Sequence, residues 1–177
     1  AADEVLTHDG TDLAWAAAGG GGITHAQLWN MNTAFEGAAT PITSNWSETW
    51  TSDIGDVNSL GSSSVTESSG VFSFGATGIW EISLTMQASD NSAADLNCFC
   101  EIHRTINNSA YTYMCRSGVG VPVASIYTTT SCHCLLDITD VANEKVRFHA
   151  ASFDTADCYG HNNYIHTYGI FKRLGDT

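Results

Sequence analysis

The chain has 177 residues, 43% of them hydrophobic, and its 19 acidic against 6 basic residues give a net charge of −13. A chain of this length can bury the core of one domain and still carry a short extension. The acidic balance argues against nucleic acid as a partner, because it repels phosphate backbones. No apolar run approaches the roughly 20 residues of a membrane-spanning helix, which argues against membrane insertion.

The N-terminal residues predict a β-hairpin. Asp9 and Gly10 separate two short alternating runs, residues 5–8 and 11–15. Asp-Gly between such runs is a strong hairpin signal, because both central positions of the turn need a positive φ. A lone hairpin is barely stable in water, so we expect it to lie against another copy of the chain or a larger assembly. The apolar residues of this candidate anchor are Val5, Leu6, Leu13 and Trp15.

Three alanines and four glycines follow the hairpin over residues 16–22. This composition is typical of a flexible linker with little to pack. We therefore divide the chain into an anchor with its linker, residues 1–22, and a head domain, residues 23–177.

Short alternating runs separated by Gly, Asn, Asp and Ser clusters make up the head. Residues 30–37 are the best helical candidate, although Pro41 soon follows, and glycines near residues 118–120 predict a loop. Alternation is clearest in residues 79–86, where the large apolar side chains share one face. The expected strands cover residues 23–31, 42–50, 71–74, 79–86, 96–106, 111–115, 123–130, 132–138, 144–151 and 164–171. About ten such strands predict an all-β jelly-roll sandwich.

Three segments of the head are similar to the C1q/TNF-like family. Residues 71–83 resemble its Phe-rich strand, a turn ending in Gly, and the alternating strand that follows. Residues 144–148 resemble a late strand after a short turn, and residues 164–171 resemble the terminal strand. Asn143 and Glu144 stand where the family often carries Gly-Asp, and no collagen-like repeat precedes the head. The resemblance implies a jelly roll that forms homotrimers.

The N-terminal segment carries a second resemblance. Residues 5–15, followed by the Ala- and Gly-rich linker, are similar to short segments that precede head domains in tailed-phage fibre and other virion proteins. Together the two resemblances imply a homotrimeric structural protein on the virion surface. Its expected partners are further copies of itself and other capsid or tail proteins. Capsid decoration and a tail-fibre appendage both remain open.

Trimerisation of a folded jelly roll requires an exposed apolar surface. Aromatic residues are favoured at interfaces, because they bury a large area with few rotamers to fix. They are equally compatible with core positions from which a hydroxyl reaches the surface. The aromatic residues expected to lie at the trimer interface are Tyr111, Tyr113, Tyr164, His166 and Tyr168.

Four of the six cysteines form two Cys-x-Cys pairs, Cys98 with Cys100 and Cys132 with Cys134. Both members of such a pair point to the same face of a strand. Their apolar neighbours favour buried free thiols over cross-strand disulfides. Zinc is the least favoured reading, because the Cys-x-x-Cys spacing of zinc knuckles is missing. We therefore expect no metal and no cofactor.

No catalytic motif is present: the chain lacks a G-x-S-x-G elbow, an H-E-x-x-H pair, a P-loop and a dinucleotide fingerprint. We therefore expect a structural protein and not an enzyme. One alternative is a module that binds a host-surface glycan or receptor through aromatic faces, with Trp46, Trp50 and Tyr159 as ligand-binding candidates. Another alternative is a secreted C1q-like protein unrelated to viruses.

Overall fold

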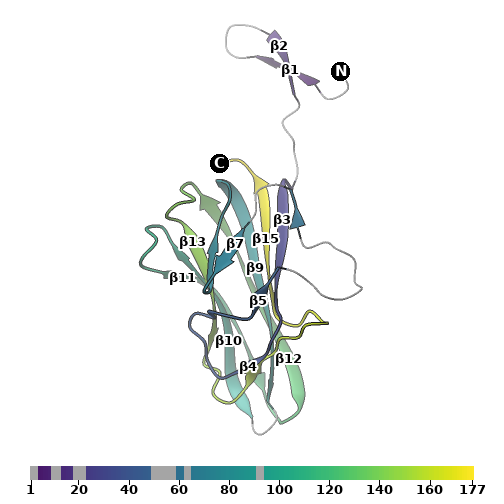
Figure 1. The fold of residues 1–177 in the computed structure, drawn as a ribbon, viewed down its shortest axis with the longest axis vertical. Coiled ribbons are helices and arrows are strands. Elements are labelled where there is room, and N and C mark those ends of the chain that lie inside the picture. The colour runs from purple at the N-terminus through teal and green to yellow at the C-terminus, as the bar shows by residue number, and fades with distance from the viewer. Residues whose placement is uncertain (1–3, 9–12, 18–22, 49–58, 62–64, 91–93) are drawn as a thin grey trace.

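The computed structural model describes residues 4–8, 13–17, 23–48, 59–61, 65–90 and 94–177 (Figure 1). These ranges contain β-strands and no helix, and their strands pair antiparallel. The head is a sandwich of two sheets, which confirms the predicted all-β jelly roll. The helical candidate over residues 30–37 forms no helix, because the first strand of the head continues through Met31 and pairs with β15 and β5 there.

The smaller sheet has five strands. Residues of β10 and β13 pair along most of their lengths, with Phe99 opposite Ala151 and Thr105 opposite Lys145. The strand order across this sheet is β11 (Thr112–Val121), β10 (Asp95–Thr105), β13 (Lys145–Ala151), β8 (Val71–Ser73) and β7 (Thr66–Ser68).

The larger sheet has eight strands, and its long strand β9 (Gly78–Asp90) pairs along its whole length with β12 (Ile126–Ile138). On its other side β9 pairs with β15 (Tyr168–Gly175), which pairs in turn with β3 (His25–Met31). The short strands that complete this sheet are β4 (Phe35–Glu36), β14 (Asp157–Cys158), β5 (Trp46–Ser47) and β6 (Ser59–Leu60).

The N-terminal strands form a sheet of their own. β1 (Glu4–His8) pairs antiparallel with β2 (Leu13–Ala17), with Glu4 opposite Ala17 and His8 opposite Leu13. The candidate anchor residues Val5, Leu6, Leu13 and Trp15 all lie on these two strands. The predicted Asp-Gly turn and the glycines of the linker lie outside the described residues.

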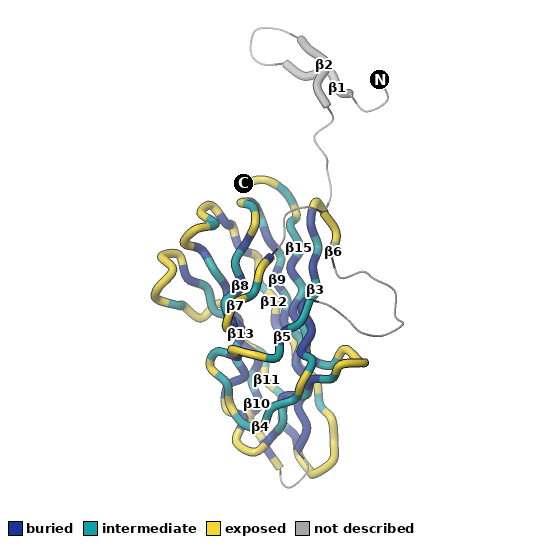
Figure 2. Tube along the Cα trace, viewed as in Figure 1, coloured by how far each residue is buried: buried dark blue, intermediate teal, exposed yellow. Residues whose placement is uncertain are grey.

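The core lies between the two sheets, where buried positions alternate with half-buried ones along β9 (Figure 2). Phe72 of β8 occupies the centre and is fully buried. Its ring centroid lies 4.7 Å from that of Phe148, 5.2 Å from that of Phe171 and 5.5 Å from that of Trp46. Trp46 is itself buried. Aromatic side chains from both sheets thus hold the sandwich together, since each buries a large apolar area.

Several strands differ from the expected ranges. Gly118 and Gly120, expected in a loop, lie within β11, where a Cβ on Gly118 would stand 2.4 Å from the Phe99 ring. The glycine therefore makes room for a ring of the neighbouring strand. Leu96, expected to share the face of Cys98, is exposed because the pairing of β10 with β11 shifts register between Asp95 and Cys98. Of the expected strand over 42–50, the described part contains only β5.

Glu144 fixes the turn between β12 and β13. Its carboxylate accepts hydrogen bonds from the hydroxyl and the backbone N–H of Thr139, at 2.9 and 3.2 Å, and from the Arg104 guanidinium. Burial raises the pKa of Glu144, but the hydrogen bonds from Arg104 and Thr139 outweigh it and hold the pKa below its usual value. The residue at which the sequence departs from the C1q/TNF-like pattern is thus a buried structural anion.

Candidate functional site

The middle of the outward face of the eight-stranded sheet carries few charges, whereas Asp137 and Asp157 lie toward its ends. The residues of β9 and β15 that do not enter the core point away from the sandwich, because side chains alternate along a strand. One row across the sheet places Ile170 between Leu28 and Ser83, and the next places Tyr168 beside Thr85. Apolar and hydroxyl side chains thus dominate this face.

A single ion pair lies on the described part of these rows, between Lys172 Nζ and Glu81 Oε2 at 3.5 Å. Leu135 of β12 lies opposite Glu81 and is 64% exposed. A sheet face with so little charge and a large exposed leucine resembles an interface more than an ordinary solvated surface.

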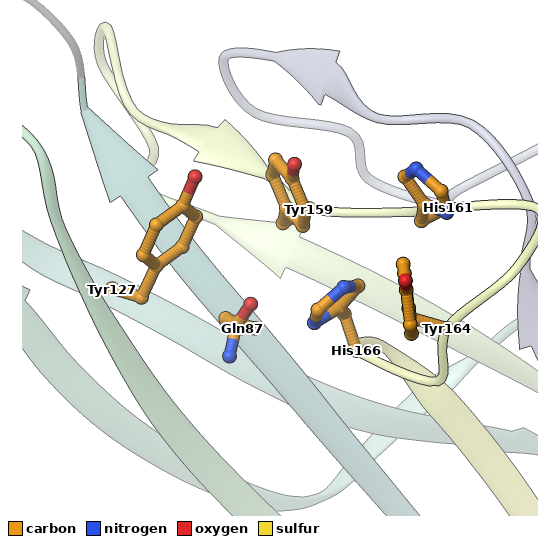
Figure 3. Close-up of a pocket in the computed structure, with 6 residues that line it drawn as sticks. All are labelled: Gln87, Tyr127, Tyr159, His161, Tyr164 and His166. Carbon is orange, nitrogen blue, oxygen red and sulfur yellow. The ribbon is translucent and has the colours of Figure 1, made fainter.

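A pocket of about 490 Å³ opens at one end of this face (Figure 3). Gln87 of β9 and Tyr127 of β12 contribute its floor, because both point outward from the sheet. The other four lining residues come from the segment between β14 and β15. The complete lining is Gln87, Tyr127, Tyr159, His161, Tyr164 and His166.

The aromatic rings of the pocket contact one another edge to face. The Tyr159 ring lies 5.2 Å from the Tyr127 ring and 4.8 Å from the His166 ring, with interplanar angles of 75° and 79°. Tyr164 lies 5.0 Å from His161. These are favourable geometries for aromatic pairs, which hold the rings in place without a ligand.

Backbone hydrogen bonds fasten the segment between β14 and β15 to the sheet. The N–H of Tyr159 donates to the carbonyl of Gln87 at 2.8 Å, and the N–H of His161 donates to the carbonyl of Met31 at 3.0 Å. From the sheet, the N–H of Gln87 donates to the Thr167 hydroxyl at 3.1 Å. The pocket is therefore built on the rigid sheet and not on a free loop.

Two ionisable groups of the pocket have pKa values shifted in the direction of the neutral form. Burial, and then the neighbouring His161, lower the pKa of His166. A hydrogen bond with Tyr159 raises the pKa of Tyr127. A pocket lined by rings, hydroxyls and an amide can stack against the flat apolar face of a ligand and form hydrogen bonds with the polar groups at its edge. This chemistry suits a sugar or the surface of another protein.

The structure divides the aromatic residues expected at the trimer interface into two groups. Tyr164 and His166 line the pocket, and Tyr168 lies on the same sheet face. Tyr111 and Tyr113 lie instead on the outer side of the five-stranded sheet. There the Tyr111 ring centroid is 3.9 Å from the Arg147 guanidinium carbon, and Tyr113 packs edge-on against His103. The five residues therefore do not share one surface.

The expected ligand-binding residues also separate. Tyr159 is in the pocket, whereas Trp46 lies in the core and is only 9% exposed, so the expectation that Trp46 meets a ligand is wrong. Trp50 lies outside the described residues. Sequence reasoning missed Gln87 and Tyr127. The alternating pattern of β12 could have identified Tyr127, because it places this side chain on the outward face of the strand.

All six cysteines are free, and Cys98, Cys100, Cys132 and Cys158 are buried. Their burial confirms the favoured reading of the two Cys-x-Cys pairs as small apolar residues, with Cys134 half-buried. The Cys132 thiol lies 3.6 Å from the carbonyl oxygen of Cys100, across the two sheets. The thiols thus contribute to the packing between the sheets.

No family model matches the sequence, and no curated protein is similar to it in sequence. Solved structures do match the fold. Eiger TNF from S. frugiperda superposes with a TM-score of 0.58 and 14% identity, over 88% of this chain and 95% of its own. Murine APRIL at pH 5.0 superposes with a TM-score of 0.56 and 11% identity, over 85% of this chain and 98% of its own.

Murine APRIL at pH 8.0 gives a TM-score of 0.51 with 12% identity, over 85% of this chain and 99% of its own. These likenesses establish that the head is a TNF-like jelly roll. The described residues contain no helix long and apolar enough to cross a membrane.

Proposed function

We propose that this chain is a structural protein that forms a homotrimer through the outward face of the eight-stranded sheet. The observation that carries the proposal is the composition of that face. Leu28, Ile170 and Tyr168 are half-buried among hydroxyl side chains, and the aromatic pocket lies on the same face. Covering such a surface with a partner lowers the free energy, because it removes apolar area from water. Further copies of this chain are the partner that the TNF-like fold favours.

We propose further that the assembly belongs to a tailed-phage virion, as a capsid decoration or tail-fibre component attached through residues 1–22. The support is the order of elements: a two-stranded sheet separate from the head, joined to it by a Gly-rich segment. A hairpin of two strands needs additional packing to be stable, which another virion protein would supply. We propose that the function is structural and not enzymatic.

The mass of the purified protein tests the trimer. We expect three chains per particle by light scattering, both for the full chain and for a chain lacking residues 1–22. Ile170→Lys places a charge in the middle of the proposed interface and should give single chains. Val71→Lys is the matched control, because Val71 points outward from the five-stranded sheet and should leave the trimer intact. A single chain at all concentrations for the unmodified protein would contradict the proposal.

The virion assignment has a separate test. We expect the full chain to bind intact particles of its phage, and the chain lacking residues 1–22 to remain in the supernatant when particles are sedimented. Binding that is independent of these residues would contradict their role as an anchor. Absence of the chain from purified particles would contradict the virion assignment itself.

A second candidate function is recognition of a host-surface glycan, favoured by the three tyrosines of the pocket. Tyrosine rings stack on the apolar faces of sugars, and Gln87 and the histidines supply hydrogen bonds. Glycan-array binding by the intact protein tests this function. Tyr159→Ala should abolish the binding while leaving the particle mass unchanged, which separates a sugar site from an interface role of the same ring.

A further inference from the structure

The outward face of the five-stranded sheet contains a cluster that the proposed function does not use. Its centre is Glu101 of β10, with His103 two residues along the same strand and His149 opposite Glu101 on β13. Side chains two residues apart share a face, and directly paired residues of antiparallel strands are nearest neighbours. The pairing thus brings one carboxylate and two imidazoles together.

The three ligand atoms are close. One oxygen or nitrogen from each of Glu101, His103 and His149 lies within 4.8 Å of the other two. Within the described part of the chain, no other set of three His, Cys, Asp or Glu side chains meets this condition. Glu101 Oε2 lies 2.7 Å from His103 Nε2, and the imidazoles of His103 and His149 are stacked with centroids 3.8 Å apart.

One of these atoms lacks a partner. Nε2 of His149 is inaccessible to solvent and makes no hydrogen bond. A buried polar nitrogen without a partner costs free energy, and each such atom in a folded protein calls for an explanation. An imidazole nitrogen is a common metal ligand, so this unpartnered Nε2 of His149 is available to bind a cation.

The carboxylate is held in place from its other side. Glu101 is 4% exposed, and its Oε1 accepts a hydrogen bond from Arg116 Nε at 2.6 Å. The Arg116 guanidinium carbon lies 4.5 Å from the Phe99 ring and 5.7 Å from the Tyr113 ring. Arg116 is therefore itself fixed, and it orients the carboxylate so that Oε2 faces His103. Partners of this kind, behind the ligands, are typical of built metal sites.

We infer that Glu101, His103 and His149 form a binding site for a divalent transition-metal ion, of which Zn²⁺ is the type that two imidazoles and one carboxylate suit best. The ion would take Glu101 Oε2 and one nitrogen of each imidazole. Binding requires the stacked rings to tilt, since the lone pairs of parallel rings cannot converge on one ion. His103 would bind through Nε2 and carry its hydrogen on Nδ1.

Positive charge nearby sets a limit on the affinity. Arg147 lies opposite His103 in the pairing of β10 with β13, and the Nε of this guanidinium has no hydrogen-bond partner. Its charge repels a bound cation, so we expect Arg147→Gln to bind Zn²⁺ several-fold more tightly. Such a gain would follow from electrostatics at the site, whereas a merely structural cluster would show none.

Titration of the intact, metal-stripped protein with Zn²⁺ tests the inference. We expect one ion per chain, and a loss of affinity of at least about tenfold in His103→Ala and in His149→Ala, the range found when metal-site partners are removed. His133→Ala is the matched control, because His133 is exposed on β12 of the other sheet. Circular dichroism verifies that each variant is folded. If a histidine variant does not fold, Glu101→Gln takes its place and should show the same loss of affinity.

Cobalt distinguishes this site from the thiols. Co²⁺ bound to nitrogen and oxygen gives visible bands without the near-ultraviolet thiolate band that cysteine ligands produce. No Zn²⁺ binding at about 100 µM metal would overturn the inference. Binding that is equal in both histidine variants, or a Co²⁺ spectrum with a thiolate band, would overturn it as well. None of these outcomes depends on the oligomeric state.

Discussion

The outward faces of the two sheets are built from the same alternation of residues but differ in chemistry. The eight-stranded sheet presents Leu28, Ile170 and Tyr168 among serines and threonines. The five-stranded sheet presents Arg116, Arg147 and the two stacked histidines. These two arginines are a third of the 6 basic residues of the chain.

The difference indicates that the faces have different neighbours. Charged and aromatic side chains on the five-stranded sheet satisfy one another by stacking, which suits a surface that stays in water. Residues on the eight-stranded sheet have few such partners and gain most when another molecule covers them. One sandwich thus separates a face for association from a face that can hold an ion, with a common core between them.

The largest loss of stability is expected from a mutation in this common core. Phe72→Ala removes the ring that contacts Phe148, Phe171 and Trp46. We expect a loss of about 3–5 kcal/mol in the free energy of unfolding, since a cavity remains between the sheets. Urea denaturation at one fixed chain concentration measures this loss. Phe99→Ala, on the half-exposed outer face of β10, is the control and should cost about 1 kcal/mol or less.

If Phe72→Ala cost no more than Phe99→Ala, the two sheets would not share one tightly packed core. The comparison of the faces would then concern two weakly coupled layers.

The next largest loss of stability is expected in the turn between β12 and β13, which connects the two sheets. Glu144→Gln keeps the shape of the side chain but removes the charge that Arg104 and Thr139 bind. We expect a cost of about 2–3 kcal/mol at pH 7, the range for hydrogen bonds to charged groups. Asp137→Asn, an exposed neighbour at the end of β12, is the control and should have little effect.

The pH dependence of this cost has a definite sign. The pKa of Glu144 is lower in the folded chain than its usual value of 4.5. Its contribution is therefore complete above pH 4.5 and is lost as the pH falls through the folded pKa. The difference in unfolding free energy between the unmodified chain and Glu144→Gln should shrink below pH 4.5. A difference that stays constant from pH 7 to pH 3 would exclude a charge effect.

Two glycines offer a matched comparison of the sheets. A Cβ on Gly169 of β15 would lie 2.5 Å from the fully buried Phe148 ring, and one on Gly118 of β11 would lie 2.4 Å from the half-exposed Phe99 ring. A buried ring cannot move aside, whereas an exposed ring can. We expect Gly169→Ala to cost about 1–2 kcal/mol through overpacking, partly offset by reduced freedom of the unfolded chain.

Gly118→Ala should cost less than about 1 kcal/mol, because only Phe99 and the guanidinium above it must shift. Thermal unfolding of the two variants at equal concentration gives the comparison. Equal losses would show that the outer layer of the five-stranded sheet is as tightly held as the core.

The strand pattern was largely predictable from the sequence, because burial on one side of a strand imposes alternation. Residues of β9 show this, with the core positions as expected. Gly118 misled the prediction, since glycine weakens a strand unless a neighbouring ring fills its space. Leu96 misled it too, because the register shift that turns this residue outward depends on pairing with β11.

The sites were less predictable, because they depend on which strands become neighbours. The pocket joins Tyr127 to Tyr159 only through the pairing of both β12 and β14 with β9. The cluster of Glu101 with His149 depends on the register of β10 with β13. No local pattern encodes these long-range pairings, so the sequence named Tyr159, Tyr164 and His166 but could not place them in one pocket with Tyr127.

The smallest expected effect is a difference in labelling rate, which reports how firmly the pocket is attached to its sheet. Cys158 is the last residue of β14 and directly precedes the segment that lines the pocket. Its side chain is fully buried, and burial raises its pKa to about 12. Cys115 of β11 is half-buried on the other sheet. Because only a thiolate reacts with iodoacetamide, we expect Cys115 to be labelled well before Cys158 in the folded chain, as peptide mass spectrometry would show. Labelling of Cys158 at the rate of Cys115 would mean that the segment between β14 and β15 opens readily, and the eight-stranded face would then lack the rigidity that an interface requires.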